Sequence, residues 1–219
     1  VISFEPNGTI LYANDNFLNA LGYRLNEVVG NHHKMFCDKK YITTQEYTEF
    51  WNNLGRGISQ INEFERIRKD GSSIWIQASY TPVKNANGKV TRVVKFAQDI
   101  TESKKVVDAV KKAINLAKTG IVKQTITETT SNEGIEELKN GINDLFEIVS
   151  CKVDGDLNKI SDALSSYQKL DFRHRITGNS LGEVSVGLNN LANVVNEMLV
   201  ENKSNGLTLD ESSNILLGN

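Results

Sequence analysis

The chain has 219 residues, with 25 Lys and Arg against 27 Asp and Glu, which gives a formal net charge of −2 at pH 7. This balance argues against a nucleic-acid-binding protein, which would carry a strongly basic surface. No stretch approaches the roughly 18 apolar residues of a membrane-spanning helix. The two cysteines lack the spacing of a disulfide framework, which favours a cytoplasmic location. Because the chain opens on Val1 inside a strand-like run, without a signal peptide, we expect a fragment of a longer protein.

The composition changes at Thr101. Of the 16 aromatic residues, 13 lie before this position, together with both prolines. An aromatic-rich half followed by an aromatic-poor, proline-free half predicts a globular α+β domain followed by an all-α region.

The first half predicts a five-stranded antiparallel sheet. The expected strands are residues 1–5, 9–13, 60–68, 72–83 and 90–99. Asp70-Gly71 and Asn87-Gly88 are dipeptides typical of tight hairpin turns, and they join the last three strands. Along the middle strand, alternate side chains from Ile74 to Tyr80 are expected on one face.

Short helices are predicted between the second and third strands. Residues 14–36 read as short helical pieces interrupted by glycines. Thr43 and Glu46 have the spacing of a capping box, in which each side chain bonds the other residue's backbone N–H. A helix of about three turns is expected to follow and to end near Gly55. Its buried face would carry Tyr47, Phe50, Trp51 and Leu54.

Three motifs in this half resemble a PAS domain. They are the opening run Asn7–Asn14, the hairpin Arg68–Ser72 and the closing Asp99-Ile100-Thr101. Taken in order, they place residues 1–101 in one sensor domain. The resemblance implies a sheet with helices over one face, and a small ligand or cofactor bound between the two layers.

Within this family, residues 30–36 and 94–97 are most similar to PAS domains of bacterial chemoreceptors, including the aerotaxis receptor. That resemblance implies FAD as a possible cofactor. The residues expected to line its site are Trp51, His33, Phe50, Tyr47 and Asn14. The chain departs from the pattern after Phe36, where Cys37-Asp38-Lys39-Lys40 replaces a basic Arg-His pair that would face the pyrophosphate.

Other interpretations of these residues stay open. Adjacent His32 and His33 point in different directions, so they make a poor two-ligand metal site, and no metal is expected. One of them could serve as a haem ligand, although a structural role without a cofactor is the simpler interpretation. Cys37 lies one turn after the position of the reactive cysteine in light-oxygen-voltage domains, which argues against flavin–cysteine photochemistry.

The second half predicts paired helices with an internal repeat. Apolar residues recur at intervals of three and four, which is the pattern of helices that bury a common seam in a parallel dimeric bundle. Gly141–Leu145 aligns with Gly187–Leu191, and in the connectors upstream Ile126 aligns with Ile176. Helix, connector and helix at this length resemble the HAMP domain, a parallel four-helix dimer that relays conformational signals.

The expected organisation is a PAS domain at 1–101, HAMP-like domains at 102–152 and 153–202, and the start of a signalling helix at 203–219. The last strand would pass strain through Asp99, Ile100 and Thr101 into a helix. At Asp154-Gly155-Asp156 the seam breaks, because the apolar spacing becomes four and four, a phase shift expected to unwind a coiled coil locally.

The sequence therefore predicts a sensing and relay region of a bacterial chemoreceptor. Its expected partners are a second copy of itself, a small-molecule ligand, a chemotaxis histidine kinase and a coupling protein. The sequence shows no paired nucleophile and base, and His174 is followed by Arg175 rather than by the acidic residue of a phosphoacceptor helix, so no enzyme is expected. The alternatives are a cofactor-free PAS dimerisation scaffold, or the input half of a sensor histidine kinase.

Overall fold

The computed structural model describes residues 1–217, the side chains of residues 214, 216 and 217 excepted. The chain divides into two compact units, of which the first is Val1–Lys105 and the second begins at Val106. The first unit holds β1 (Ile2–Phe4), β2 (Ile10–Ala13), α1 (Asp15–Leu21), α2 (Leu25–Val28), η1 (His33–Phe36), η2 (Tyr41–Thr43), α3 (Gln45–Gly55), β3 (Gln60–Ile67), β4 (Ser73–Lys84) and β5 (Val90–Asp99). Then follow α4 (Thr101–Ala117), which spans the division, and α5 (Glu133–Lys152), α6 (Leu157–Gln168) and α7 (Glu183–Leu217).

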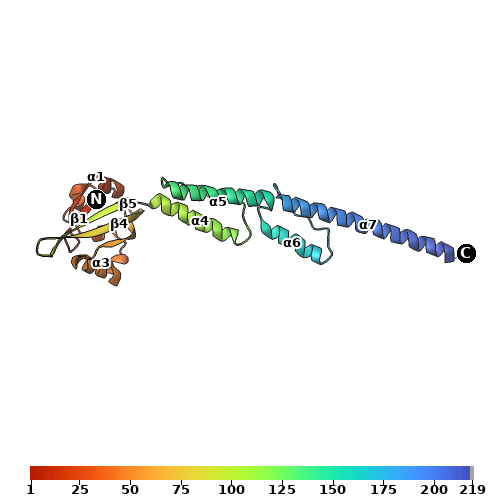
Figure 1. Cartoon of the computed structure of the whole chain (residues 1–219), viewed down its shortest axis with the longest axis horizontal. Coiled ribbons are helices and arrows are strands. Elements are labelled where there is room, and N and C mark those ends of the chain that lie inside the picture. Colours follow the sequence, from red (N-terminus) through yellow and green to blue (C-terminus); the bar gives the residue numbers. More distant parts are fainter. Residues whose placement is uncertain (218–219) are drawn as a thin grey trace. The chain divides into compact units, whose positions relative to one another are not determined.

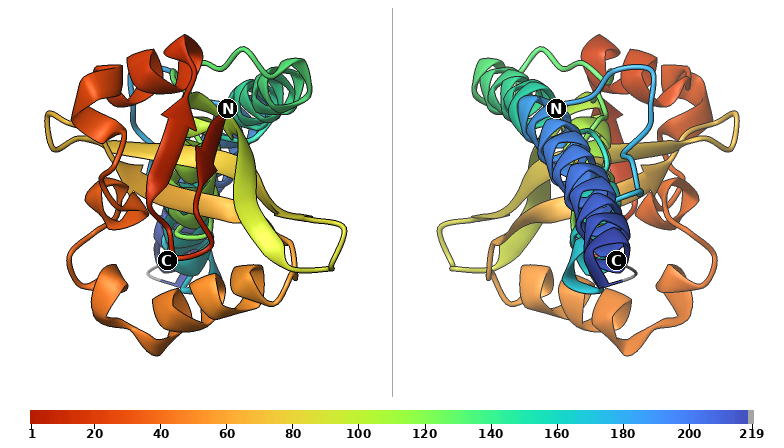
Figure 2. Two further views of the ribbon diagram at one scale, coloured as in Figure 1. Left: turned by 90° about the vertical axis from the view of Figure 1, so that its left-hand side faces the viewer. Right: turned by 90° about the vertical axis from the view of Figure 1, so that its right-hand side faces the viewer.

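The first unit is a five-stranded antiparallel sheet, as predicted (Figure 1). Its strands lie in the order β2-β1-β5-β4-β3. Five short helices lie in the chain between β2 and β3. The two predicted hairpin turns project at opposite ends of the sheet (Figure 2). In each turn the glycine has a positive φ, 86° at Gly71 and 78° at Gly88, a conformation that side chains with a Cβ disfavour.

The predicted inward face of β4 is confirmed. Ile74, Ile76, Ala78 and Tyr80 are all at most 4% exposed and belong to one apolar core with residues of the helices. Period-two alternation puts these side chains on the side of the sheet that the helices cover, which removes their apolar surface from water.

The helix α3 has its predicted extent, but the predicted cap was one residue early. Thr44 is the N-cap, and its hydroxyl accepts a hydrogen bond from the Tyr47 N–H at 3.2 Å. The Thr43 hydroxyl instead donates to the Lys40 carbonyl at 2.8 Å. The physical reason is that Thr43 still belongs to η2, so the extended backbone that an N-cap needs first occurs at Thr44.

The second unit contains two helix pairs, α4 beside α5 and α6 beside the first part of α7 (Figure 1). The extended connectors pack into these pairs. Val122 and Ile126 join a cluster with Phe146, and Ile176 joins a cluster with Tyr167. Each connector therefore supplies apolar residues to the core of its own helix pair.

The two asparagines aligned by the sequence repeat make the same contact. Asn143 accepts from the Ile126 N–H at 2.9 Å and donates to the Ile126 carbonyl at 3.1 Å. Asn189 makes both bonds to Ile176, each at 2.9 Å. Each side chain thus satisfies both backbone groups of one connector residue. This shared contact is the structural counterpart of the repeat.

The predicted break in the apolar seam at Asp154-Gly155-Asp156 lies at a turn rather than in a locally unwound coiled coil, because α5 ends at Lys152 and α6 begins only at Leu157. The Asp154 carboxylate accepts hydrogen bonds from the Ser185 hydroxyl at 2.6 Å and from the Gly182 N–H at 3.4 Å. The Asp156 side chain caps α6. Asp154 also accepts from the Asp156 N–H at 3.0 Å, and Asp156 accepts from the Asn158 N–H at 3.1 Å. Such local side-chain-to-backbone bonds favour a turn over a helix here.

Large apolar side chains of the second unit are exposed in the single chain, including Leu138, Leu145, Leu191 and Met198. The segment 203–217 belongs to α7, whereas positions 218 and 219 of the predicted signalling helix lie outside the described residues. Among the described residues, no helix has both the length and the apolar character that a membrane crossing requires.

Candidate functional site

The candidate site is centred on His33 in the interior of the first unit. The preceding residue fixes its direction, because His32 caps η1 by accepting from the Lys34 N–H and also bonds the Asn7 carbonyl oxygen at 2.8 Å. His32 is therefore held half-buried against the backbone of the β1–β2 turn, while His33 is 0% exposed. The predicted divergence of the two adjacent histidines is confirmed.

Both ring nitrogens of His33 contact tyrosine hydroxyls. Nδ1 lies 3.2 Å from the hydroxyl of Tyr47 on α3, and Nε2 lies 3.1 Å from the hydroxyl of Tyr80 on β4. The Tyr80 hydroxyl also accepts from Nη2 of Arg66 on β3 at 3.4 Å. A chain of polar groups thus runs through the core from β3 to α3.

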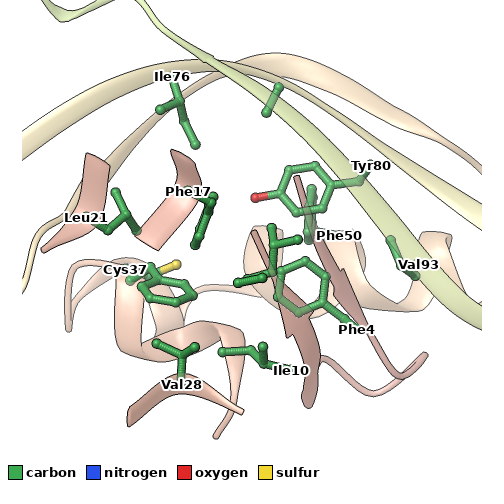
Figure 3. Close-up of a cluster of buried hydrophobic side chains, with 14 of the residues drawn as sticks. Phe4, Ile10, Phe17, Leu21, Val28, Cys37, Phe50, Ile76, Tyr80 and Val93 are labelled. Atoms are coloured by element: carbon green, nitrogen blue, oxygen red, sulfur yellow. The ribbon is translucent and has the colours of Figure 1, made fainter. Parts of the chain in front are cut away.

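Aromatic rings enclose this polar chain. Phe4, Phe36, Phe50 and Trp51 each contact the His33 ring, with centroid separations between 5.3 and 6.4 Å. Figure 3 shows part of this core, in which side chains of the sheet and of the helices point toward one another. The ring contacts exclude water, so the polar groups inside interact in a low dielectric.

Two cationic side chains reach the same interior. Arg66 and Lys95 are 2% and 1% exposed. Lys95 pairs with Tyr80 in the β4–β5 ladder, and its ammonium nitrogen lies 4.8 Å from the Tyr80 ring centroid and 5.4 Å from that of Phe17. Among the ion pairs of the described residues, neither cation is joined to a carboxylate.

Burial and these neighbouring cations shift the titration of the core. Burial, followed by the charges of Arg66, Lys95 and His32, holds the pKa of His33 well below its usual range. Burial and Arg66 likewise hold the pKa of Lys95 well below its usual value. Burial raises the pKa of Tyr80 to about 12. His33 is therefore neutral near pH 7, and its two nitrogens act as one donor and one acceptor.

The structure brings four of the five predicted site residues together. Trp51, His33, Phe50 and Tyr47 share this core, whereas Asn14 caps α1 by accepting from the Phe17 N–H at 3.1 Å. Short polar side chains at a strand-to-helix boundary are the usual N-caps, which explains the position of Asn14.

Sequence reasoning missed Arg66, Lys95 and Tyr80 as polar members of the site. A signal was present for Lys95, because it lies two residues after Val93 on a strand whose alternate positions face the core. A lysine at such an inward position is unusual, and it indicates that this strand brings a polar group into the core.

A flavin or haem ring does not fit the residues in this arrangement. Both His33 nitrogens that could ligate iron contact tyrosine hydroxyls. The Trp51 ring is in edge contact with protein rings, those of Phe4, His33 and Phe50, rather than facing an open slot. Neither group therefore enters the function proposed below.

The predicted relay residues form a hydrogen-bonded junction between the sheet and α4. The Thr101 hydroxyl accepts from the Trp75 N–H at 3.0 Å and donates to the Asp99 carboxylate at 2.6 Å. The Ile100 N–H donates to the Trp75 carbonyl at 2.9 Å. Lys104, in the first turn of α4, forms an ion pair with Glu63 of β3. The beginning of α4 is thus attached to β3, β4 and β5.

Comparison with known proteins assigns the fold of the first unit. The family model described as the PAS fold matches residues 10–97. The biofilm dispersion protein BdlA of Pseudomonas aeruginosa is 40% identical over 99 residues, which span 45% of this chain and 24% of that protein. The bacterioopsin transcriptional activator of Halobacterium salinarum is 31% identical over 98 residues, or 45% of this chain and 14% of that protein.

A solved light-oxygen-voltage domain, studied with a flavin analogue, aligns with a TM-score of 0.42 at 24% identity, covering 52% of this chain and 85% of that one. The chain spans about a quarter or less of the length of the two curated relatives named above. The matched segment and the strand order agree with the resemblance found in the sequence, so residues 10–97 form a PAS domain.

Proposed function

We propose that this chain is the signal-input and relay region of a bacterial chemoreceptor. The observation that carries the sensing role is the buried polar chain from Arg66 through Tyr80 to His33 inside a PAS domain. A core built for stability alone would be apolar, because buried polar and charged groups lose solvation. Their presence between the sheet and the helices supports a site for a small ligand.

The junction at the end of β5 supports an output route. A ligand that shifts β4 or β5 would change the bonds of Trp75 with Ile100 and Thr101, since these residues connect the sheet to α4. Because α4 is a continuous helix from Thr101 to Ala117, a change in its first turn is transmitted along its length.

The second unit is proposed to consist of two HAMP-like relays in a homodimer. The support is the repeated asparagine contact and the exposed apolar rows of α5 and α7. In the full-length protein the relay would lead to a chemotaxis histidine kinase and its coupling protein. The proposed role needs no enzymatic activity, and a cytoplasmic location is part of the proposal because both cysteines are free thiols.

The first experiment is an absorption spectrum of freshly purified chain, followed by a thermal-shift screen of small molecules. We expect a spectrum without flavin or haem bands and at least one ligand that raises the melting temperature. Amide hydrogen exchange with and without that ligand then tests the relay. Protection is expected to change at Ile100, at Thr101 and in the first turns of α4.

Thr101→Val is the matched variant, because it keeps the shape of the side chain but removes its hydroxyl. It should bind the ligand as before and lose the change in α4. A bound flavin or haem would instead indicate redox or gas sensing and overturn a colourless ligand. A ligand that binds without changing α4, or the failure of every ligand, would favour the cofactor-free scaffold.

A further inference from the structure

We propose that the interior of the first unit binds a small organic monocarboxylate, held by Arg66 and Lys95 with the Trp51 indole N–H as a further donor. This inference rests on the proposed sensing role and names the chemical class of the ligand. It follows from an imbalance in the core, where cationic groups and hydrogen-bond donors outnumber their partners.

The buried charges of the first unit are not balanced. All of residues 1–105 are described, and the buried polar or charged residues among them are His33, Arg66 and Lys95, none of them acidic. An arginine keeps its charge in proteins, so Arg66 cannot relieve the cost of burial by losing a proton. A buried charge without a counter-charge is destabilising, and an anionic ligand would remove that cost.

The core also contains unpaired hydrogen-bond donors. Nε of Arg66 and Nε1 of Trp51 are both buried and make no hydrogen bond of ordinary geometry, although the indole N–H partly offsets the rise in the pKa of the nearby Tyr47 hydroxyl. Each such group costs free energy, and native proteins satisfy the great majority of them. Both donors belong to residues that pack around the His33–Tyr80 pair, since Arg66 bonds Tyr80 and Trp51 contacts His33. One acceptor-rich group is the simplest partner for both.

The buried amine of Lys95 also lacks a counter-charge. Its ammonium nitrogen lies against the rings of Tyr80 and Phe17, and no carboxylate is paired with it. A carboxylate beside the amine would restore its charged form, because an opposite charge at short range favours ionisation. Arg66 comes from β3 and Lys95 from β5, so the two cations approach the same interior from both sides of β4.

The side chains around these two cations favour an organic anion over an inorganic one. The core near these cations consists of aromatic and aliphatic side chains such as Phe17, Phe50 and Ile76. In Figure 3 the Tyr80 hydroxyl and the Cys37 sulfur both point into this core. Inorganic phosphate would need polar contacts on every side, whereas a carboxylate with an apolar body offers charge at one end and apolar surface at the other.

A pocket at the sheet edge limits the charge of the ligand. It has a volume of about 240 Å³ and is lined by Tyr41, Phe64 and Arg66 together with four acidic residues. The acidic residues are Asp38, Glu46, Glu63 and Glu65. A ligand that approaches Arg66 through this pocket passes these carboxylates, which repel a multiply charged anion more strongly than a singly charged one.

The test is a titration of isotopically labelled chain with benzoate, followed through the indole N–H resonances of the two tryptophans. Benzamide has the same shape without the charge, and inorganic phosphate has charge without an apolar body. We expect benzoate to shift the Trp51 indole resonance in a saturable manner and to leave that of Trp75 nearly unchanged. Trp75 lies on the opposite face of β4 and lines the edge pocket, so a shift of its resonance alone would report binding in that pocket rather than in the interior.

Lys95→Met is the decisive variant, with Lys89→Met in the exposed β4–β5 turn as its matched control. Loss of a charge-assisted contact should weaken benzoate binding roughly tenfold or more. The melting temperature of the variant should rise, because an apolar side chain replaces a buried amine. The control should keep wild-type affinity. The rise in melting temperature also separates lost binding from lost folding.

Equal binding of benzoate and benzamide, or unchanged binding by Lys95→Met, would overturn the assignment of a carboxylate. Phosphate binding as tight as that of benzoate would overturn its organic character, and a flavin or haem that co-purifies would overturn the ligand class. The absence of binding by benzoate and by acetate, the smaller probe, would overturn the site itself. These outcomes are read at Trp51, so they are distinct from a failure of the relay, which is read in α4.

Discussion

His33 is a titratable side chain whose two ring nitrogens contact tyrosine hydroxyls in a core from which water is excluded. A charged imidazolium would lose its hydration in this core, and it would also face the cations Arg66 and Lys95. The folded protein therefore holds the neutral ring, which donates to one tyrosine hydroxyl and accepts from the other.

This state makes the stability of the first unit sensitive to acid. The pKa of His33 is well below its usual value in the folded chain, whereas in the unfolded chain the ring takes up a proton near pH 6.5. Below that pH the unfolded state binds the additional proton, so the free energy of unfolding should fall by up to about 1.4 kcal/mol per pH unit. Denaturant titrations between pH 7.5 and 5 (the assay range) measure this slope.

His33→Gln is the matched variant, because its amide also offers one donor and one acceptor to the tyrosine hydroxyls without titrating. Its stability should decline less steeply with acid than that of the wild type. Equal slopes in the two proteins would show that other groups, such as carboxylates common to both, control the acid response.

The polar members of the site were the part that sequence reasoning predicted least well. Trp51 and His33 were predicted as site residues because a tryptophan and a histidine at these positions match the pattern of the family. Arg66 and Lys95 were missed because surface strands commonly carry such residues, and inward direction depends on register. Register follows from the sheet pairing, in which Lys95 lies opposite Tyr80.

At the scale of elements, local chemistry predicted the strands and turns well. Asp-Gly and Asn-Gly turns fix both hairpins, since few other residues accept the positive φ of their glycines. The position of the break at Asp154–Asp156 was predicted from apolar spacing, but the hydrogen bonds that Asp154 accepts from Gly182 and Ser185, far along the chain, were not. Apolar spacing alone carries no information about such distant partners.

The asparagine contacts of the two connectors give an element-scale prediction. Asn143→Ala should expose both backbone groups of Ile126, and Asn189→Ala those of Ile176, at a cost of about 1–3 kcal/mol each. The effect should be local, since each asparagine contacts its own connector. Amide exchange of the two isoleucines measures it, and each variant should accelerate exchange at one connector.

Asn190→Ala is the control for these variants. Asn190 is adjacent to Asn189 on the same helix but exposed, so its replacement should leave the exchange of Ile176 unchanged. If Asn143→Ala and Asn189→Ala accelerated exchange at both connectors equally, the second unit would open as one cooperative body rather than as two repeats.

At the scale of the whole molecule, the second unit leaves apolar rows without a partner in the single chain. On α5, Leu138 and Leu145 are 62% and 56% exposed, and on α7, Val184, Leu191 and Met198 are 43%, 52% and 56% exposed. Within each helix these residues are seven positions apart, the repeat by which helices pack in a parallel coiled coil. Hydropathy spacing predicted these rows, and a partner is the usual reason for a soluble helix to retain them.

The predicted partner is a second copy of the chain, and Leu145→Glu combined with Leu191→Glu tests it. Each buried leucine contributes about 1.5–3 kcal/mol, and two opposed carboxylates in a dimer seam repel each other. Sedimentation equilibrium should show a dimer for the wild type and a monomer for the double variant, with helix content nearly unchanged because both positions are exposed in the single chain. Asn140→Glu with Asn190→Glu adds the same charge at exposed positions outside the rows and should remain dimeric. A monomeric wild type, or dissociation by the control pair as well, would show that these rows do not join two copies. The relay would then have to operate within one chain.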